Sequence, residues 1–259
     1  MTDAPTTPET KSKAEMPLTM HLAELRTRLI RSLAAVLVTT ILCVNYTDKI
    51  FEILQSPMRK TFITFDFIGT GPADAFIVGL QVSILAGFLA ASPFIFYQVW
   101  CFILPGMHEK EQRLALPFVV LCTLFFLSGT FFCFEIVLPT AFQYFYEQYT
   151  SLAVKPQIKI DEYLSFIIKL MLVFGGVFEL PILSFFLARV GILTHTWLIR
   201  QARISIVLIF VIAGIFTPPD VVSQLLLATP LLVIYAMSIG IAYWWGKPRS
   251  KAEAEKPAA

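Results

Sequence analysis

Residues 75–96 read AFIVGLQVSILAGFLAASPFIF, a stretch without a charged side chain. As a helix rising 1.5 Å per residue it would be about 33 Å long, enough to cross the hydrocarbon core of a bilayer. Five further apolar runs are each bounded by charged residues or proline: 29–46, 114–134, 163–188, 204–216 and 221–243. The pattern predicts an all-α integral membrane protein with six transmembrane helices.

The composition indicates a bilayer rather than water as the main solvent. Hydrophobic residues make up 57% of the 259 and charged residues 15%, below the roughly 25% charged residues of soluble domains. The net charge of +2 indicates no nucleic-acid partner.

The side chains that most often form metal or redox sites are few. The chain has four cysteines and three histidines: Cys43, Cys101, Cys122, Cys133, His21, His108 and His195. None of them has the spacing of a zinc, redox or catalytic motif. We expect no enzyme activity, metal or cofactor, and we interpret the cysteines as packing residues.

The fifth run is the shortest. Its thirteen residues, 204–216, would cover about 20 Å as a helix. The sequence TPPD at 217–220 must end that helix, because proline donates no amide and disfavours helix at the residue before it. We expect the fifth and sixth helices to be short, to form a hairpin here and to thin the bilayer locally.

The basic residues set the orientation. Lys and Arg number fourteen on the side of the termini and five on the other side, with Lys169 inside a run. The positive-inside bias therefore places both termini in the cytoplasm. We expect a disordered N-terminus at 1–20, a six-helix membrane domain at 21–245 and a disordered tail at 246–259.

Two long segments on the opposite side, 47–74 and 135–162, carry aromatic and charged residues and are expected to form an ordered cap. Five aromatic residues fit either an interfacial belt, which we favour, or packing of the cap: Phe142, Tyr144, Phe145, Tyr146 and Tyr149. Small residues recur every four positions in the second run: Gly79, Ser83, Gly87 and Ala91. We expect this stripe to pack against a neighbouring helix of the chain, with a contact between two copies as the alternative.

Polar residues gather at two predicted cytoplasmic helix ends. Residues 21–29 read HLAELRTRL, where Glu24 and Arg28 are four apart and able to pair. By composition alone this is an ordinary basic anchor before the first span. Residues 102–113 read FILPGMHEKEQR, in which acidic Glu109 and Glu111 contribute little to orientation. Carboxylates at the ends of separate helices could each bind a guanidinium in bidentate geometry.

Glu179 lies inside the fourth run, where an ionised side chain costs free energy unless it is paired or hydrated. Lys169 is about 15 Å away along a helix, so the two cannot pair directly. We favour a functional carboxyl over a structural one bonded to another helix. An alternative function is a secondary transporter of a small solute that uses Glu179 for proton coupling, and another is a scaffold without a ligand.

Four motifs occur in order: HLAELRTRL at 21–29, YQVWCFILPG at 97–106 with Glu111 after it, FELP at 178–181 and TPPDVVSQ at 217–224. Together they resemble the TatC family, the multi-span subunit of the twin-arginine protein translocase, over residues 18–245. The resemblance implies a receptor in the bacterial cytoplasmic membrane for twin-arginine signal peptides of folded substrate proteins. It further implies an oligomeric complex with single-span TatA/TatB-type subunits.

The resemblance also implies roles for particular residues. Glu24 and Glu111 match the glutamates that bind the arginine pair. The positions that support that site match Arg26, Phe102 and Pro105. Partner helices dock near the positions of Thr217 and Gln224, and Glu179 matches the intramembrane glutamate. Some members carry methionine where this chain has Gly214.

Overall fold

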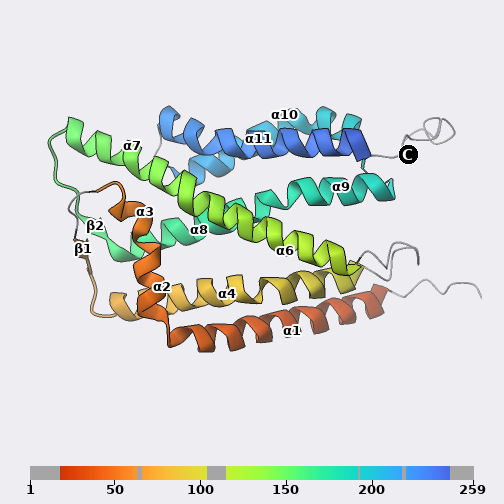
Figure 1. Ribbon diagram of the computed structural model, residues 1–259, viewed down its shortest axis with the longest axis horizontal. Coiled ribbons are helices and arrows are strands. Elements are labelled where there is room, and N and C mark those ends of the chain that lie inside the picture. Colours follow the sequence, from red (N-terminus) through yellow and green to blue (C-terminus); the bar gives the residue numbers. More distant parts are fainter. Residues whose placement is uncertain (1–17, 63–65, 104–114, 192, 218–219, 246–259) are drawn as a thin grey trace, which may run out of the picture.

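The structure is a computed structural model that describes residues 18–62, 66–103, 115–191, 193–217 and 220–245 (Figure 1). Within these residues, six helical segments are long and apolar enough to cross a membrane: His21–Val44, Asp74–Ile103, Leu116–Ser151, Ile160–Arg189, His195–Phe216 and Val221–Trp245. The predicted six-span all-α architecture is thereby confirmed. Residues 1–17 and 246–259, which we expect to be disordered, lie outside the described residues. The first helix begins at Leu18, ahead of the predicted domain start at His21.

The spans are built from these elements: α1 (Leu18–Val44), α4 (Asp74–Ile103), α6 (Ala115–Phe132), a π-helical turn η2 (Cys133–Val137), α7 (Leu138–Ser151), α8 (Ile160–Phe178), α9 (Leu180–Val190), α10 (His195–Phe216) and α11 (Val221–Trp245). In Figure 1, α1 and α4 lie along one edge and α10 and α11 along the other, with α6 to α9 between them. α1 begins and α11 ends at the same end of the molecule, which we call the terminal end. The opposite end is the cap end.

Two spans are interrupted next to a proline. In the third, α6 continues through η2 into α7, well past the predicted end of the run. Pro139 cannot donate an amide to the carbonyl of Glu135, and the wider π-helical turn accommodates the missing bond. In the fourth, Pro181 cannot donate to Val177, and the helix breaks at Glu179 into α8 and α9.

The cap end is ordered, as predicted. It contains α7 together with four short elements: α2 (Thr47–Leu54), α3 (Ser56–Arg59), β1 (Phe67–Ile68) and β2 (Ile158–Lys159). The two strands pair in parallel. Lys60 Nζ donates to Glu135 Oε2 at 2.7 Å, and Tyr163 Oη donates to the carbonyl of Leu54 at 2.8 Å. These contacts join the two predicted cap segments to each other and to α8.

Two aromatic residues of α7 pack inside this cap. Phe142 is buried and stacks on Tyr163, with ring centroids 5.6 Å apart. Tyr146 meets Phe62 edge-on at 4.9 Å. The favoured interpretation as an interfacial belt is therefore wrong for Phe142 and Tyr146, because these rings contact protein rather than lipid.

The small-residue stripe of α4 packs against α1, as predicted. Thr39 Oγ1 donates to the carbonyl of Gly87 at 2.7 Å, and Ser83 and Thr47 share a hydroxyl hydrogen bond of 2.7 Å. A side chain at Gly87 would collide with Thr40. The stripe thus serves intramolecular contact.

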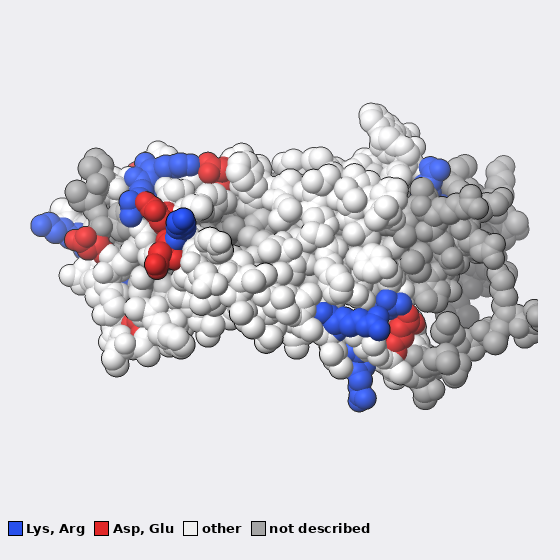
Figure 2. All heavy atoms as spheres, turned by 60° about the horizontal axis from the view of Figure 1, so that its bottom comes forward, with Lys and Arg blue, Asp and Glu red and all other residues white. Residues whose placement is uncertain are grey.

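The surface between the two ends is apolar. On the face shown in Figure 2, charged side chains gather toward the two ends and leave an uncharged band between them. On α1, Leu29, Leu33 and Leu37 are 66%, 67% and 60% exposed. Such a band is suited to contact with lipid.

The last two helices form the predicted hairpin, with α10 ending at Phe216 and α11 beginning at Val221. They are 22 and 25 residues long. α10 starts before the apolar run 204–216, and its first turns carry Arg200 and Arg203. What is short is therefore the apolar part of α10, not either helix.

Candidate functional site

Two predicted site segments meet at the terminal end. His21, Glu24 and Arg28 are spaced by three and four residues, so they share one face of α1. The His21 ring stacks on Phe102 of α4, with centroids 4.3 Å apart and planes inclined by 23°. Deeper along the helices, Arg28 Nη1 donates to Gln98 Oε1 at 3.5 Å. The start of α1 and the end of α4 are thus held side by side.

Glu24 is bonded within its own helix, as its spacing predicts. Arg28 donates from Nε to Glu24 Oε1 at 3.0 Å and also from Nη2 to the same oxygen. The two side chains are 21% (Arg28) and 23% (Glu24) exposed. Within the described part of the chain Oε2 accepts no hydrogen bond, so one carboxylate oxygen is open to a further donor.

The other predicted site residues are placed only in part. Phe102 is half-buried against His21. Arg26 is exposed and forms no ion pair with a described residue. Pro105 and Glu111 lie outside the described residues, so the meeting of Glu24 and Glu111 stays a prediction.

Two buried supports escaped the sequence reasoning. Gln98 is 5% exposed and holds Arg28 from below. Trp100 is 2% exposed, stacks on Phe118 at 4.1 Å and meets Phe186 edge-on at 4.7 Å, which joins α4 to α6 and α9. An amide within an apolar helix needs a hydrogen-bond partner, so a polar contact at Gln98 could have been predicted from the sequence.

Glu179 lies at the break between α8 and α9 and faces protein, not lipid. It is 7% exposed, and its Oε1 has no hydrogen-bond partner among the described residues. The Cys122 thiol and the backbone of Phe126, both on α6, are polar neighbours of this carboxyl. Among the described residues no group of three or more His, Cys, Asp or Glu could hold a metal ion.

The two predicted docking residues both bond to α10. Thr217 is 9% exposed, and its hydroxyl donates to the carbonyl of Ala213 at 2.9 Å. Gln224 Nε2 reaches from α11 to the carbonyl of Phe210 at 2.9 Å. A Cβ atom at Gly214 would lie 3.0 Å from that amide nitrogen, so glycine leaves room for Gln224 to cross the hairpin.

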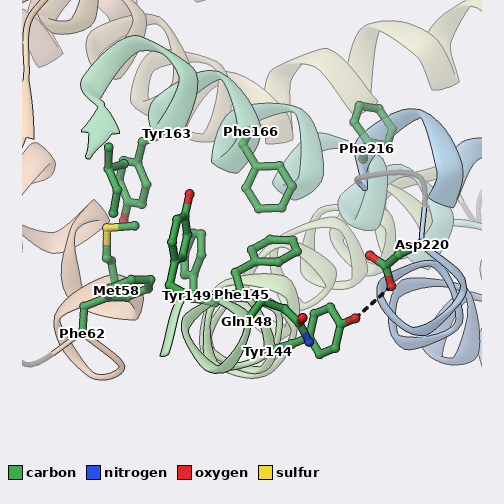
Figure 3. Close-up of a pocket in the computed structure, with 12 residues that line it drawn as sticks. Met58, Phe62, Tyr144, Phe145, Gln148, Tyr149, Tyr163, Phe166, Phe216 and Asp220 are labelled. Atoms are coloured by element: carbon green, nitrogen blue, oxygen red, sulfur yellow. Dashed lines mark hydrogen bonds between the residues drawn. The ribbon is translucent and has the colours of Figure 1, made fainter. Parts of the chain in front are cut away.

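A cavity of about 520 Å³ opens at the cap end, between α7, α8 and the helix hairpin (Figure 3). Its walls are mainly aromatic, and Phe145 and Phe166 point into it from α7 and α8. Tyr144 Oη donates to Asp220 Oδ1 at 3.0 Å at one edge. Asp220 also accepts the amide of Ser223 at 2.8 Å and the Ser223 hydroxyl, and so caps α11.

Comparison with known proteins gives consistent matches. Residues 20–230 match the family described as Sec-independent protein translocase protein (TatC). The protein of that name from Aquifex aeolicus is 38% identical over 225 residues, 86% of this chain and 93% of the relative. That from Desulforapulum autotrophicum is 38% identical over 246 residues, 95% of this chain and 91% of the relative. A crystal structure of the twin arginine translocase receptor TatC superposes with a TM-score of 0.79 at 36% identity, covering 86% of this chain and 97% of that one.

Proposed function

The chain belongs to the TatC family and is a multi-pass membrane subunit of the Sec-independent protein translocase, and on this premise we propose that it is the receptor for twin-arginine signal peptides. In this proposal it binds these peptides at its cytoplasmic face and recruits single-span TatA/TatB-type subunits into an oligomeric complex. The complex moves folded proteins across the bacterial cytoplasmic membrane. Both termini are cytoplasmic, which the excess of Lys and Arg on their side supports.

The meeting of α1 and α4 at the terminal end carries this proposal. A guanidinium from the peptide donates to the open Oε2 of Glu24, next to the bond that Arg28 already makes to Oε1. The second guanidinium binds Glu111. The His21 and Phe102 stack, together with Arg26 and Pro105, supports the site from the sides. Two separate carboxylates thus account for a requirement for two arginines.

Partner subunits dock along α10 and α11. Thr217 and Gln224 are polar groups near the turn of the hairpin, and a polar side chain of an arriving helix can exchange bonds with them. Gln224 Nε2 already donates to the backbone of α10. A partner helix therefore either replaces this hydrogen bond or bonds to the amide groups of Gln224 that the bond leaves unused.

Binding of an arginine-paired peptide to the purified chain tests the receptor proposal. We expect Glu24→Gln and Glu111→Gln each to weaken binding about tenfold, since each removes a charge-assisted hydrogen bond. If each carboxylate binds one arginine, the loss of binding free energy in the double variant should equal the sum of the losses in the two single variants. A peptide with two lysines should also bind more weakly, because lysine lacks the bidentate fork.

Glu162→Gln is the matched control, because this carboxylate is at the cap end and pairs with Lys159 at 3.1 Å. It should leave peptide affinity unchanged. The proposal fails if Glu24→Gln and Glu111→Gln bind the peptide as tightly as the unmodified chain while remaining folded.

A further inference from the structure

A groove of about 290 Å³ lies between α4 and α8 within the spans. The α4 wall runs from Gln81 to Phe88 and the α8 wall from Ser165 to Leu172, with lining residues three or four positions apart on each helix. With this spacing the lining residues follow one face of each helix, so the groove runs parallel to both helix axes. α6 packs against both helices but lines no described part of the groove, which therefore opens on the side that α6 leaves uncovered.

Each polar side chain in this groove can donate a hydrogen bond. Lys169 is exposed and forms no ion pair or side-chain hydrogen bond with a described residue. On the facing wall, Gln81 Oε1 is a buried acceptor without a partner among those residues, and the amide nitrogen of the same side chain is the group that can donate to an anion. Ser165 adds a hydroxyl, and no acidic residue lines the described walls. An ammonium, an amide and a hydroxyl form a donor set for an oxyanion.

The depth of these groups restricts the source of that oxyanion. Lys169 lies nine residues after the start of α8 and Gln81 seven after the start of α4, about 14 Å and 10 Å along the helices. Both helices start at the cap end, where the headgroup layer is about 5–7 Å deep. With the headgroup layer placed at the starts of these helices, a lipid phosphate lies level with the first turns of α8, and the Lys169 side chain would have to extend toward it. An ionised lysine at this depth costs free energy unless an anion at the same level pairs with it.

We propose that this groove binds a transmembrane helix of a partner protein that carries an Asp or Glu side chain in the half of the bilayer nearest the cap end. The carboxylate accepts hydrogen bonds from the ammonium of Lys169 and the amide of Gln81. The apolar side chains of Ile84, Phe88 and Leu172 pack along the partner helix. The site is separate from Glu24 at the terminal end and from the α10–α11 hairpin, so it does not depend on the receptor proposal.

The test uses the purified full chain in phosphatidylcholine vesicles and two synthetic single-span peptides. The peptides are identical Leu/Ala-rich helices with either one Glu or one Gln at the depth of Lys169. Association is measured by energy transfer between labelled chain and labelled peptide. We expect the Glu peptide to bind about tenfold more tightly than the Gln peptide, the size of a strong interhelical hydrogen bond in membranes.

Three variants locate the preference. Lys169→Leu should abolish it, Lys169→Arg should retain it, and Lys159→Leu, a change of equal charge at the exposed cap strand, should also retain it. The midpoint of unfolding by sodium dodecyl sulfate in mixed micelles reports whether Lys169→Leu is folded, and binding of an arginine-paired peptide scores the receptor proposal separately.

Equal binding of the two synthetic peptides, or a Glu preference that persists in Lys169→Leu, overturns the proposal. If added phosphatidylglycerol removes the Glu preference, the groove holds lipid phosphate and the proposal is likewise overturned.

Discussion

Asp220 joins two elements with one carboxylate, since it caps α11 through Ser223 and accepts the hydroxyl of Tyr144 from α7. Hydrogen bonds from Ser223, with a smaller contribution from Tyr144, hold the pKa of Asp220 below its ordinary value. A lowered folded-state pKa means that the stabilisation is fully present above the ordinary pKa of about 3.9. It is lost only as the pH falls through the lowered value.

We therefore expect Tyr144→Phe to loosen the junction of α7 and α11 at neutral pH, because Asp220 loses a donor while its cap on α11 remains. Hydrogen exchange measured by mass spectrometry should show about fivefold lower protection in the last turns of α7 and the first turn of α11, the effect of one net hydrogen bond. Tyr149→Phe is the control, since Tyr149 lines the same cavity but its hydroxyl bonds to no described residue.

In the unmodified chain, protection at this junction should be the same at pH 7 and pH 5 after correction for intrinsic exchange rates, because Asp220 stays ionised at both. Loosening at pH 5 would contradict a lowered pKa.

Helix packing in the middle of the fold depends on close approach between α6 and α8. A Cβ atom at Gly129 would lie 2.6 Å from Phe178 Cβ and 2.8 Å from the carbonyl of Phe174. The second obstacle is backbone, so it cannot rotate away. Gly175 faces α6 in the same manner, where a Cβ atom would lie 2.6 Å from the Phe126 ring.

We expect Gly129→Ala to destabilise the fold by about 1–3 kcal/mol, the usual effect of overpacking a tight contact. The midpoint of unfolding by sodium dodecyl sulfate in mixed micelles measures the change. Gly176→Ala is the matched control, because a Cβ atom there meets nothing within 4 Å and alanine favours helix. A loss of stability in Gly176→Ala equal to that in Gly129→Ala would show that glycine itself, not the α6–α8 contact, is responsible.

The positions of the helices are easier to predict from the sequence than the positions at which the helices are interrupted. Hydrophobic runs and the two prolines after Thr217 suffice for the spans and the hairpin, because both depend on local chemistry. The break at Glu179 and the extension of α6 into α7 also have local causes, in Pro181 and Pro139. Hydropathy is averaged over many residues, so a single proline does not change the predicted span.

In the candidate site, too, local contacts could be predicted from the sequence and long-range contacts could not. The bond between Arg28 and Glu24 follows from helical spacing and is predictable. The stacking of His21 on Phe102 and the bond from Arg28 to Gln98 join residues about 80 and 70 positions apart, and only the packing of α1 on α4 brings them together. A single sequence does not show which distant residues will come into contact.

The whole molecule presents unequal thickness to the bilayer. The continuous helix α4 has 30 residues, whereas the apolar part of α10 extends only over 204–216, below Arg200 and Arg203. Both arginines are exposed, and burying them in hydrocarbon would cost several kcal/mol. We therefore expect the bilayer to approach the shorter apolar length on the α10 side, at a modest cost per Å of mismatch.

We expect the bilayer to be about 5–10 Å thinner beside α10 than beside α1 and α4, from the difference between an apolar length near 20 Å and a core near 30 Å. Cryo-electron microscopy of the chain in lipid nanodiscs measures both thicknesses in one particle. Replacing Arg200 and Arg203 by leucine extends the apolar run back toward Trp197 and should remove the difference. A bilayer of uniform thickness around the unmodified chain would rule out thinning. In that case the double substitution would leave the thickness unchanged. If thinning occurs, the hairpin that we propose as the docking site for partner helices lies where the barrier to a polar substrate is lowest.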